Sequence, residues 1–227
     1  MSIVTVRGLE REYRQGDLVV RALRGVDLDI DTGEFTALMG PSGSGKTTLL
    51  NLIGALDEPT AGTVTVDGKE LSSMSAGARS DMRLARLGFV FQSYNLIPVL
   101  SAFENAEFPL LLLGTPPKER KDRVMATLKA VGLEGMEHRR PNELSGGQQQ
   151  RVAVARAIAG QPALVLADEP TANLDSKTGN ELVALMQRLN EEQGVTFVFA
   201  THDPKVMAAA RRVVRLVDGA IDTEERK

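Results

Sequence analysis

Residues 40–47, Gly40-Pro-Ser-Gly-Ser-Gly-Lys46-Thr47, match the pattern G-x-x-x-x-G-K-[ST] at every fixed position. An apolar segment, residues 35–39, precedes this stretch, and apolar residues at helical spacing follow it from residue 49. A strand, a glycine-rich turn and a helix in that order are the setting of a phosphate-binding loop. The stretch therefore predicts an α/β fold in which backbone N–H groups of the loop surround a phosphate group.

Two side chains of this loop have predicted roles toward a bound nucleotide. Lys46 is expected to reach the β- and γ-phosphates, and the Thr47 hydroxyl is expected to bind Mg²⁺. The N-terminus of the following helix adds a favourable field for the anion. The candidate nucleotide-binding residues of the loop are Gly40, Pro41, Ser42, Gly43, Ser44, Gly45, Lys46, Thr47 and Thr48.

A second apolar segment ends in two adjacent carboxylates. Residues 164–167 are Leu-Val-Leu-Ala, and Asp168 and Glu169 follow directly. A carboxylate at the end of a strand beside a phosphate-binding loop can hold Mg²⁺, usually through water, and this is the predicted role of Asp168. Glu169 is the candidate catalytic base, which would orient and deprotonate the attacking water.

A second anion-binding element is predicted at Leu144-Ser-Gly-Gly-Gln148, before a helical segment that runs to Ala159. Its candidate ligand-binding residues are Ser145, Gly146, Gly147 and Gln148. A serine and two glycines at a helix N-terminus can bind an anion. Because one nucleotide does not need two such elements from one chain, we interpret this one as closing on a nucleotide held by a second protomer. The alternative is a flexible helix cap with no ligand.

The rest of the sequence predicts one α/β domain with a helical insert. Predicted strands cover residues 3–6, 26–30, 35–39, 88–92, 163–167 and 195–200, and predicted helices cover residues 75–86, 146–159 and 175–193. A hairpin is expected around Asp218-Gly219. We expect a P-loop core with a parallel sheet and an N-terminal antiparallel β segment over residues 1–93 and 161–227. A helical subdomain is expected over about residues 94–160.

The composition excludes several kinds of site. The chain has 227 residues, no cysteine, two histidines and a net charge of −3. Disulfides, zinc–thiolate sites and thiol catalysis are therefore excluded, and the acidic balance disfavours a dedicated nucleic-acid binder. No apolar run approaches the ~18 residues that span a bilayer, and the N-terminus lacks the apolar core of a secretory signal. We expect a cytoplasmic chain that reaches a membrane only through another protein.

The order of these motifs resembles that of the ATP-binding-cassette (ABC) ATPases over nearly the whole chain. The matching features are the P-loop, Gln92, the LSGGQ sequence, Asp168-Glu169, Asn173-Leu174-Asp175 and His202. The resemblance implies that Tyr13 stacks on adenine and that Gln92 touches Mg²⁺ or water and senses a membrane partner. It also implies that Ser145, Gly146 and Gly147 bind the γ-phosphate of ATP on the opposite protomer. Asp175 would link the two sites of the dimer, and His202 would contact the γ-phosphate.

A finer resemblance is to the branch that contains lipoprotein-releasing and macrolide-export ATPases. It is carried by residues 54–62, by residues 88–98, and by Glu104-Asn105 followed by Pro109. Ala172 departs from this branch, which usually has glycine before Asn-Leu-Asp. The resemblance implies an ATP-hydrolysing subunit that works as a homodimer and moves a separate transmembrane permease subunit, in transport or in mechanotransmission.

Two rival functions are weighed against this one. An ABC ATPase that regulates a membrane-linked, non-transport process would have the same motifs and stays open. A soluble ABC ATPase acting on nucleic acid is disfavoured, because the interval between Lys46 and Ser145 shows no sustained heptad repeat of the kind that forms long coiled coils.

The segment after Gln92 is predicted to be a docking surface for the membrane partner. It contains the apolar residues Leu96, Ile97, Pro98, Val99, Leu100 and Phe103. We expect some of them to stay exposed and to line a groove between the core and the helical insert, in which an amphipathic helix of the partner would lie. The alternative is that all six belong to the core.

Overall fold

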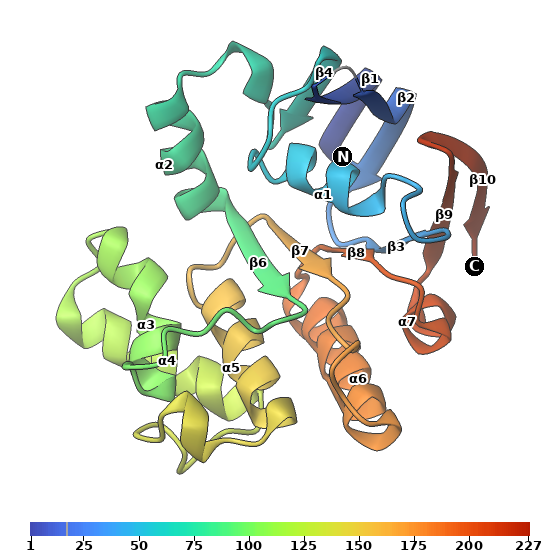
Figure 1. The fold of residues 1–227 in the computed structure, drawn as a ribbon. Coiled ribbons are helices and arrows are strands. Elements are labelled where there is room, and N and C mark those ends of the chain that lie inside the picture. The colour runs from blue at the N-terminus through green and yellow to red at the C-terminus, as the bar shows by residue number, and fades with distance from the viewer. Residues whose placement is uncertain (17) are drawn as a thin grey trace.

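The computed structural model describes residues 1–16 and 18–227, and its first layer is an antiparallel sheet in the order β2-β1-β4-β5 (Figure 1). The strands are β1 (Ser2–Gln15), β2 (Leu18–Asp31), β4 (Ala61–Val66) and β5 (Lys69–Glu70). Alternate residues face the core, so that buried Val4 pairs with Ile30 and buried Val6 with Leu28. The predicted N-terminal antiparallel segment is confirmed.

The second layer is a six-stranded sheet in the order β10-β9-β3-β8-β7-β6. Its strands are β3 (Phe35–Met39), β6 (Leu87–Phe91), β7 (Leu164–Asp168), β8 (Phe197–Ala200), β9 (Arg212–Val217) and β10 (Ala220–Arg226). Strands β6, β7, β8, β3 and β9 are parallel, and β10 pairs with β9 in the hairpin predicted at Asp218-Gly219. Strands β3, β6, β7 and β8 have no exposed residue, which explains why their sequences are continuous apolar runs.

Two hydrophobic clusters lie on opposite faces of this parallel sheet. Leu164, Leu166 and Val198 point into the cluster that contains α1 (Lys46–Ile53) and the antiparallel sheet. Val165 and Phe197 point into the other cluster, which contains α5 (Gly146–Ala159) and α6 (Ser176–Gln193). Because side chains alternate along a strand, neighbouring residues of β7 pack into different hydrophobic clusters, one on each face of the sheet.

The predicted helical segment contains α3 (Ala102–Leu112), α4 (Pro117–Ala130) and α5, which pack on one another. Figure 1 places these three helices together, away from the antiparallel sheet. Helix α5 also packs against β6, so the segment shares a hydrophobic cluster with the core. The remaining helices are α2 (Ala76–Arg86), α7 (Pro204–Ala209) and the short 3-10 turns η1 (Leu71–Ser73) and η2 (Pro141–Glu143).

Side-chain caps fix where several helices begin. Ser101 and Ser145 cap α3 and α5 in reciprocal pairs with Glu104 and Gln148, and Asp175 caps α6. Each of these side chains satisfies backbone N–H groups in the first turn of its helix. None of the helices in the described residues is long and apolar enough to cross a bilayer.

Candidate active site

The glycine-rich loop lies between β3 and α1, as predicted. Gly40 has a φ of 151°, and a Cβ atom there would lie 2.2 Å from the backbone oxygen of Leu216 on β9. Only glycine therefore allows the chain to turn this closely past β9. The side chain of Lys46 folds back over the loop, where Nζ donates hydrogen bonds to the carbonyl oxygens of Gly40 at 2.8 Å and Pro41 at 2.9 Å. This places a buried ammonium beside the start of α1, where a polyphosphate would bind.

Thr47 and Asp168 come together at the end of the parallel sheet. The Thr47 hydroxyl donates a hydrogen bond of 3.1 Å to Oδ1 of Asp168, the last residue of β7. Burial raises the pKa of the Asp168 carboxyl above its ordinary value, and the neighbouring Glu169 raises it further, against the lowering effects of Thr47 and Lys46. A cation bound beside Asp168 would offset the burial that raises this pKa.

The donor set at this point fits Mg²⁺. A hydroxyl and a carboxylate supply the hard oxygen ligands that Mg²⁺ requires. Within residues 1–16 and 18–227 no group of three or more His, Cys, Asp or Glu side chains could hold a metal ion by itself. The usual magnesium site of nucleotide enzymes has one or two protein ligands and is completed by phosphate oxygens and water.

Asp168→Asn should raise the melting temperature of the nucleotide-free protein at neutral pH, by about 1–3 °C. Because the folded-state pKa of Asp168 is raised, the ionised form is disfavoured in the folded protein above the pKa of the unfolded chain. Asparagine removes this penalty. The gain should therefore shrink as the pH falls and Asp168 becomes protonated, which scanning calorimetry at several pH values would measure. An equal gain at every pH would contradict this explanation.

The candidate base Glu169 is held by two neighbours on the β8 side of the sheet. Its Oε1 lies 2.6 Å from Nδ1 of His202, and its Oε2 accepts a 3.0 Å hydrogen bond from the Thr201 hydroxyl. Glu169 also adopts a left-handed φ of 45°, which is unfavourable for a residue with a side chain. The local fold thus holds this carboxylate in one orientation, and it pairs Glu169 with His202 directly.

One cavity of about 790 Å³ joins most of the predicted site residues. It is lined by Tyr13 on β1, by the P-loop, by Gln92 after β6, and by Glu169 and His202 after β7 and β8. These elements converge because the carboxyl ends of adjacent parallel strands lie at one edge of the sheet. Val20, Arg21 and Ala22 of β2 also line this cavity and were missed, because nothing in their sequence distinguishes them from other strand residues.

The second anion-binding element lies apart from this cavity. Ser145, Gly146, Gly147 and Gln148 are not among its lining residues. The Ser145 side chain accepts a hydrogen bond from the Gln148 backbone N–H, and a Cβ atom at Gly147 would lie 2.2 Å from a side-chain carbon of Thr178 on α6. Asp175 is also outside the cavity, and its carboxylate accepts hydrogen bonds from Thr178 and from the Lys177 backbone, which lower its pKa. One chain therefore does not bring the two predicted anion-binding elements together.

Comparison with known proteins decides the family. The family model described as ABC transporter matches residues 23–172, which is more than half of the chain. This chain belongs to the ABC transporter family, among its ATP-binding proteins. The family resemblance seen in the sequence is thereby confirmed.

Curated relatives place this ABC protein near the branch expected from its sequence. An ABC transporter ATP-binding protein of Thermotoga maritima is 49% identical over 95% of this chain and 92% of its own length. The lipoprotein-releasing system ATP-binding protein LolD of Anaeromyxobacter dehalogenans is 48% identical over 96% and 92%. The macrolide export ATP-binding/permease protein MacB of Syntrophobacter fumaroxidans is 46% identical over 99% of this chain but only 32% of its own length.

Solved structures support the fold and the activity. The ATP-binding cassette MJ0796 of Methanocaldococcus jannaschii, solved as a dimer in a post-hydrolysis state with ADP and Pi, has a TM-score of 0.90 and 44% identity over 98% of both chains. This ABC protein is an ATPase with the expected α/β fold, an antiparallel N-terminal sheet, a mostly parallel sheet and a helical insert.

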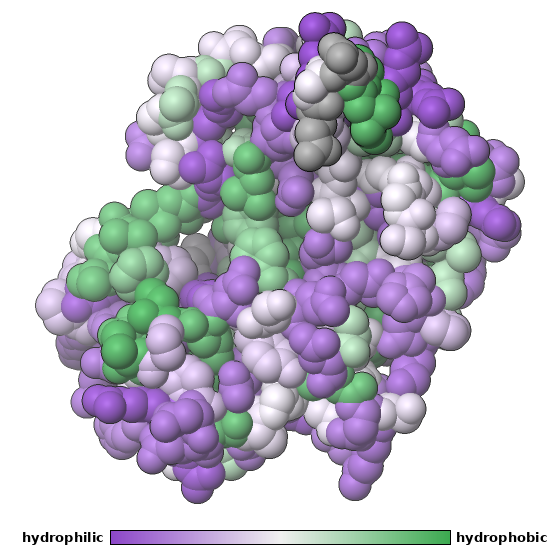
Figure 2. All heavy atoms as spheres, viewed as in Figure 1, coloured by the Kyte–Doolittle hydropathy of each residue, from purple (hydrophilic) through white to green (hydrophobic). Residues whose placement is uncertain are grey.

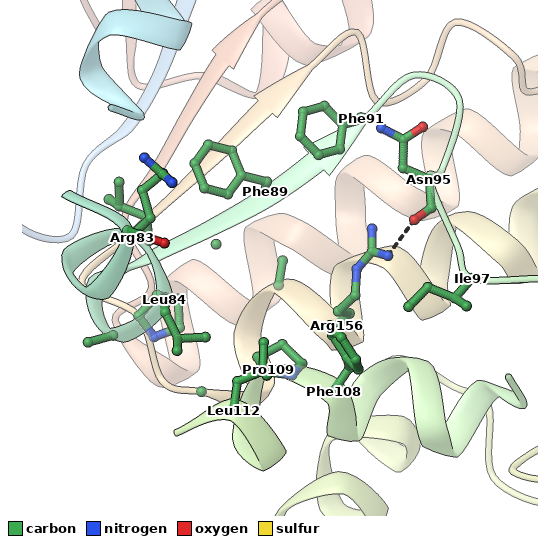
Figure 3. A pocket seen from close by; sticks show the side chains of 17 residues that line it. Arg83, Leu84, Phe89, Phe91, Asn95, Ile97, Phe108, Pro109, Leu112 and Arg156 are labelled. Carbon is green, nitrogen blue, oxygen red and sulfur yellow. Dashed lines mark hydrogen bonds between the residues drawn. The ribbon is translucent and has the colours of Figure 1, made fainter. Parts of the chain in front are cut away.

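A second, apolar pocket of about 390 Å³ lies on this ABC ATPase between α2, β6, α3 and α5. Figure 3 shows Phe89 and Phe91 of β6 facing Phe108, Pro109 and Leu112 of α3 across it, with Arg156 of α5 between them. We call this pocket the α3–β6 groove. The Arg156 guanidinium donates hydrogen bonds to the carbonyl oxygens of Asn95 at 2.5 Å and Tyr94 at 3.0 Å, so it fastens the segment after Gln92.

The structure agrees with only part of the exposure and groove lining expected for residues 96–103. Pro98 and Val99 are exposed, but of the six predicted residues only Ile97 lines the groove. Leu96 and Phe103 are partly buried against the core cluster, so Leu96 is not the exposed groove residue that we expected. The buried Asn105 explains this, because its amide binds the backbone of Ile97, Leu100 and Ser101 and draws the segment onto α3.

Proposed function

We propose that this ABC ATPase drives a separate transmembrane permease subunit, in transport or in mechanotransmission, by closing and reopening as an ATP-bound homodimer at the cytoplasmic face of the membrane. The observation that carries the proposal is the α3–β6 groove next to the Gln92 segment. The names of relatives agree with it, since LolD is an ATP-binding protein of a lipoprotein-releasing system and MacB is an ATP-binding/permease protein. Regulation of a membrane-linked, non-transport process would use the same surfaces.

The separation of the two anion-binding elements supports a site shared between protomers. The cavity of one chain contains the P-loop but not Ser145, Gly146 or Gly147. These residues lie at the N-terminus of α5, where backbone N–H groups can bind the γ-phosphate of an ATP held by the opposite protomer. Asp175 caps the neighbouring helix α6. We assign to it the role of connecting the two sites of the dimer.

Hydrolysis at this site would follow from the positions of four side chains. Glu169, oriented by Thr201 and His202, would accept a proton from the water that attacks the γ-phosphorus. The Lys46 ammonium would offset charge on the β- and γ-phosphates. Thr47 and Asp168 would hold Mg²⁺, with Gln92 near it, and the ion would neutralise charge on the phosphate oxygens. His202 would donate a hydrogen bond to the γ-phosphate from its other ring nitrogen, Nε2, because Nδ1 faces Glu169.

The α3–β6 groove fits an amphipathic segment that carries an acidic residue. Figure 2 shows hydrophobic residues gathered around the hollow next to α3, and Phe108, Leu111 and Leu112 are exposed there. Arg156 lies in the groove, where burial lowers its pKa and no carboxylate of the described residues raises it. Apolar contacts together with a carboxylate opposite Arg156 would therefore bind such a segment of the transmembrane partner.

Motion of the partner would move Gln92 in the active site through the residues directly after it. The segment that Arg156 fastens begins directly after Gln92, which lines the nucleotide cavity. A shift of the docked segment would displace Tyr94 and Asn95, which both have positive φ angles, and would reposition Gln92 relative to Mg²⁺ or the attacking water. This gives a physical connection between docking and hydrolysis.

Phe108→Glu should weaken binding of the transmembrane subunit roughly 100-fold, because the change replaces an aromatic ring in an apolar contact with a carboxylate, which would also compete with the acidic residue of the partner for Arg156. ATP affinity and folding of the isolated chain should be unchanged, since Phe108 lies outside the nucleotide cavity. The matched control is Met125→Glu, because Met125 is exposed to a similar degree on α4 and does not line the groove. Quantified recovery of the identified subunit with each tagged variant is the measurement. Equal recovery with Phe108→Glu and wild type would contradict the proposal.

A further inference from the structure

The ring of Tyr13 is held by two charged residues that have no role in the site described so far. Tyr13 donates a 2.7 Å hydrogen bond from its hydroxyl to Oδ2 of Asp57, and the other oxygen of Asp57 pairs with Arg11 at 2.7 Å. The Arg11 guanidinium lies over the Tyr13 ring, 4.5 Å from its centroid. These three side chains form a closed set in which each contacts the other two.

The backbone explains why the three meet. Arg11 and Tyr13 are two positions apart on β1 and therefore point to the same face of the sheet. Asp57 comes from the segment between α1 and β4, which belongs to the stretch that resembles the lipoprotein-releasing and macrolide-export branch. Asp57 also accepts a hydrogen bond from the Glu58 backbone N–H, which fixes its carboxylate.

The two faces of the Tyr13 ring have different surroundings. Arg11 and Asp57 line a cavity separate from the nucleotide cavity, whereas Tyr13 lines the nucleotide cavity itself. The guanidinium therefore covers the ring on the side away from the nucleotide cavity and leaves the other face for a flat ligand. A half-exposed tyrosine with free torsion angles would lose side-chain entropy on stacking, and a ring that is already fixed avoids that cost.

We propose that Arg11 and Asp57 are positioning residues that fix the Tyr13 ring as the stacking platform for the adenine base. The inference rests on the proposed function as an ATPase and on the adenine-stacking role that the family resemblance implies for Tyr13. The pair acts on the base and not on the phosphates, because it contacts Tyr13 and does not line the cavity that holds the P-loop. Its effect should therefore be seen with ligands that carry a base and be absent with ligands that do not.

The test compares the affinities of ADP and inorganic pyrophosphate by titration calorimetry, because neither ligand is hydrolysed by an ATPase. Asp57→Ala and Arg11→Ala should each raise the Kd of ADP about 5–10-fold, and the Kd of pyrophosphate should stay within about twofold. Asp57→Asn should restore part of the ADP affinity, because the amide oxygen still accepts a hydrogen bond from Tyr13. The matched control is Asp29→Asn, which breaks the Arg7–Asp29 ion pair between β1 and β2 and should change neither affinity.

Tyr13→Ala separates failure of this inference from failure of the underlying role of Tyr13. If Tyr13→Ala weakens ADP and the Asp57 and Arg11 variants do not, the positioning role is wrong. Equal weakening of ADP and pyrophosphate in those variants would show a general structural effect and would also overturn it. If Tyr13→Ala leaves the ADP affinity unchanged, the adenine platform itself is wrong.

Discussion

Glu169→Gln should reduce ATP turnover by about 10²–10⁴-fold while ATP binding is preserved. Glutamine keeps the size of the side chain and can still pair with Thr201, but it cannot accept a proton from water. The P-loop contacts of Lys46 do not involve Glu169, so the nucleotide should still bind. Without hydrolysis the closed dimer would not reopen. An ATP-bound dimer should therefore accumulate.

Phosphate release with the membrane subunit present, and the mass of the ATP-bound species by light scattering, measure these two effects. Glu192→Gln is a suitable control, because Glu192 is an exposed residue of α6 outside the cavity. Near-normal turnover of Glu169→Gln would reject Glu169 as the base, and the pairing with His202 would then be only structural.

Lys46→Ala and Gly146→Asp should each lower turnover by about 10²-fold or more when every protomer carries the change. The first removes the ammonium of the P-loop, and the second places a carboxylate where the γ-phosphate of the opposite protomer would bind. If the site is shared, a mixed dimer has one composite site built from the intact P-loop of one protomer and the intact α5 N-terminus of the other. Equal mixing of exchanging protomers should then restore up to about a quarter of wild-type turnover.

The composition of the mixed dimers has to be verified with two different affinity tags. Mixing Lys46→Ala protomers with Glu169→Gln protomers is the matched control. In that mixed dimer the P-loop side of both composite sites is damaged, so turnover should not return. A verified Lys46→Ala/Gly146→Asp dimer that remains as inactive as its parents would contradict independent shared sites.

The sequence was sufficient to predict the placement of candidate site residues wherever local pattern determines local structure. The P-loop between β3 and α1 follows from glycine spacing and helical periodicity, and the carboxylates after β7 follow from an apolar run that ends in two acids. The N-terminus of α5 was predicted from a serine and two glycines before a helical segment, and in the structure Ser145 and Gln148 form a reciprocal cap there. In each case the pattern that decides the structure lies within a few consecutive residues.

Contacts between distant segments were not predictable in this way. Asp57 lies 44 residues from Tyr13 in the chain, and no short pattern connects them. From the sequence, Leu96 and its neighbours were placed in the groove. An apolar loop sequence alone does not show whether such residues are exposed or belong to the core. The actual walls include Phe89, Phe91 and Phe108, which have the spacing of ordinary core residues in a strand and a helix. Their exposure depends on how α3 and β6 are packed.

The coupling of hydrolysis to a docked membrane partner is tested most directly by the rate of phosphate release with and without that partner. The measurement uses the identified transmembrane subunit in lipid nanodiscs and compares wild type with Phe108→Glu and Met125→Glu at saturating ATP. We expect the subunit to change the turnover of wild type and Met125→Glu severalfold and to leave Phe108→Glu at the rate of the chain alone. A wild-type rate that is the same with and without the bound subunit would contradict the coupling.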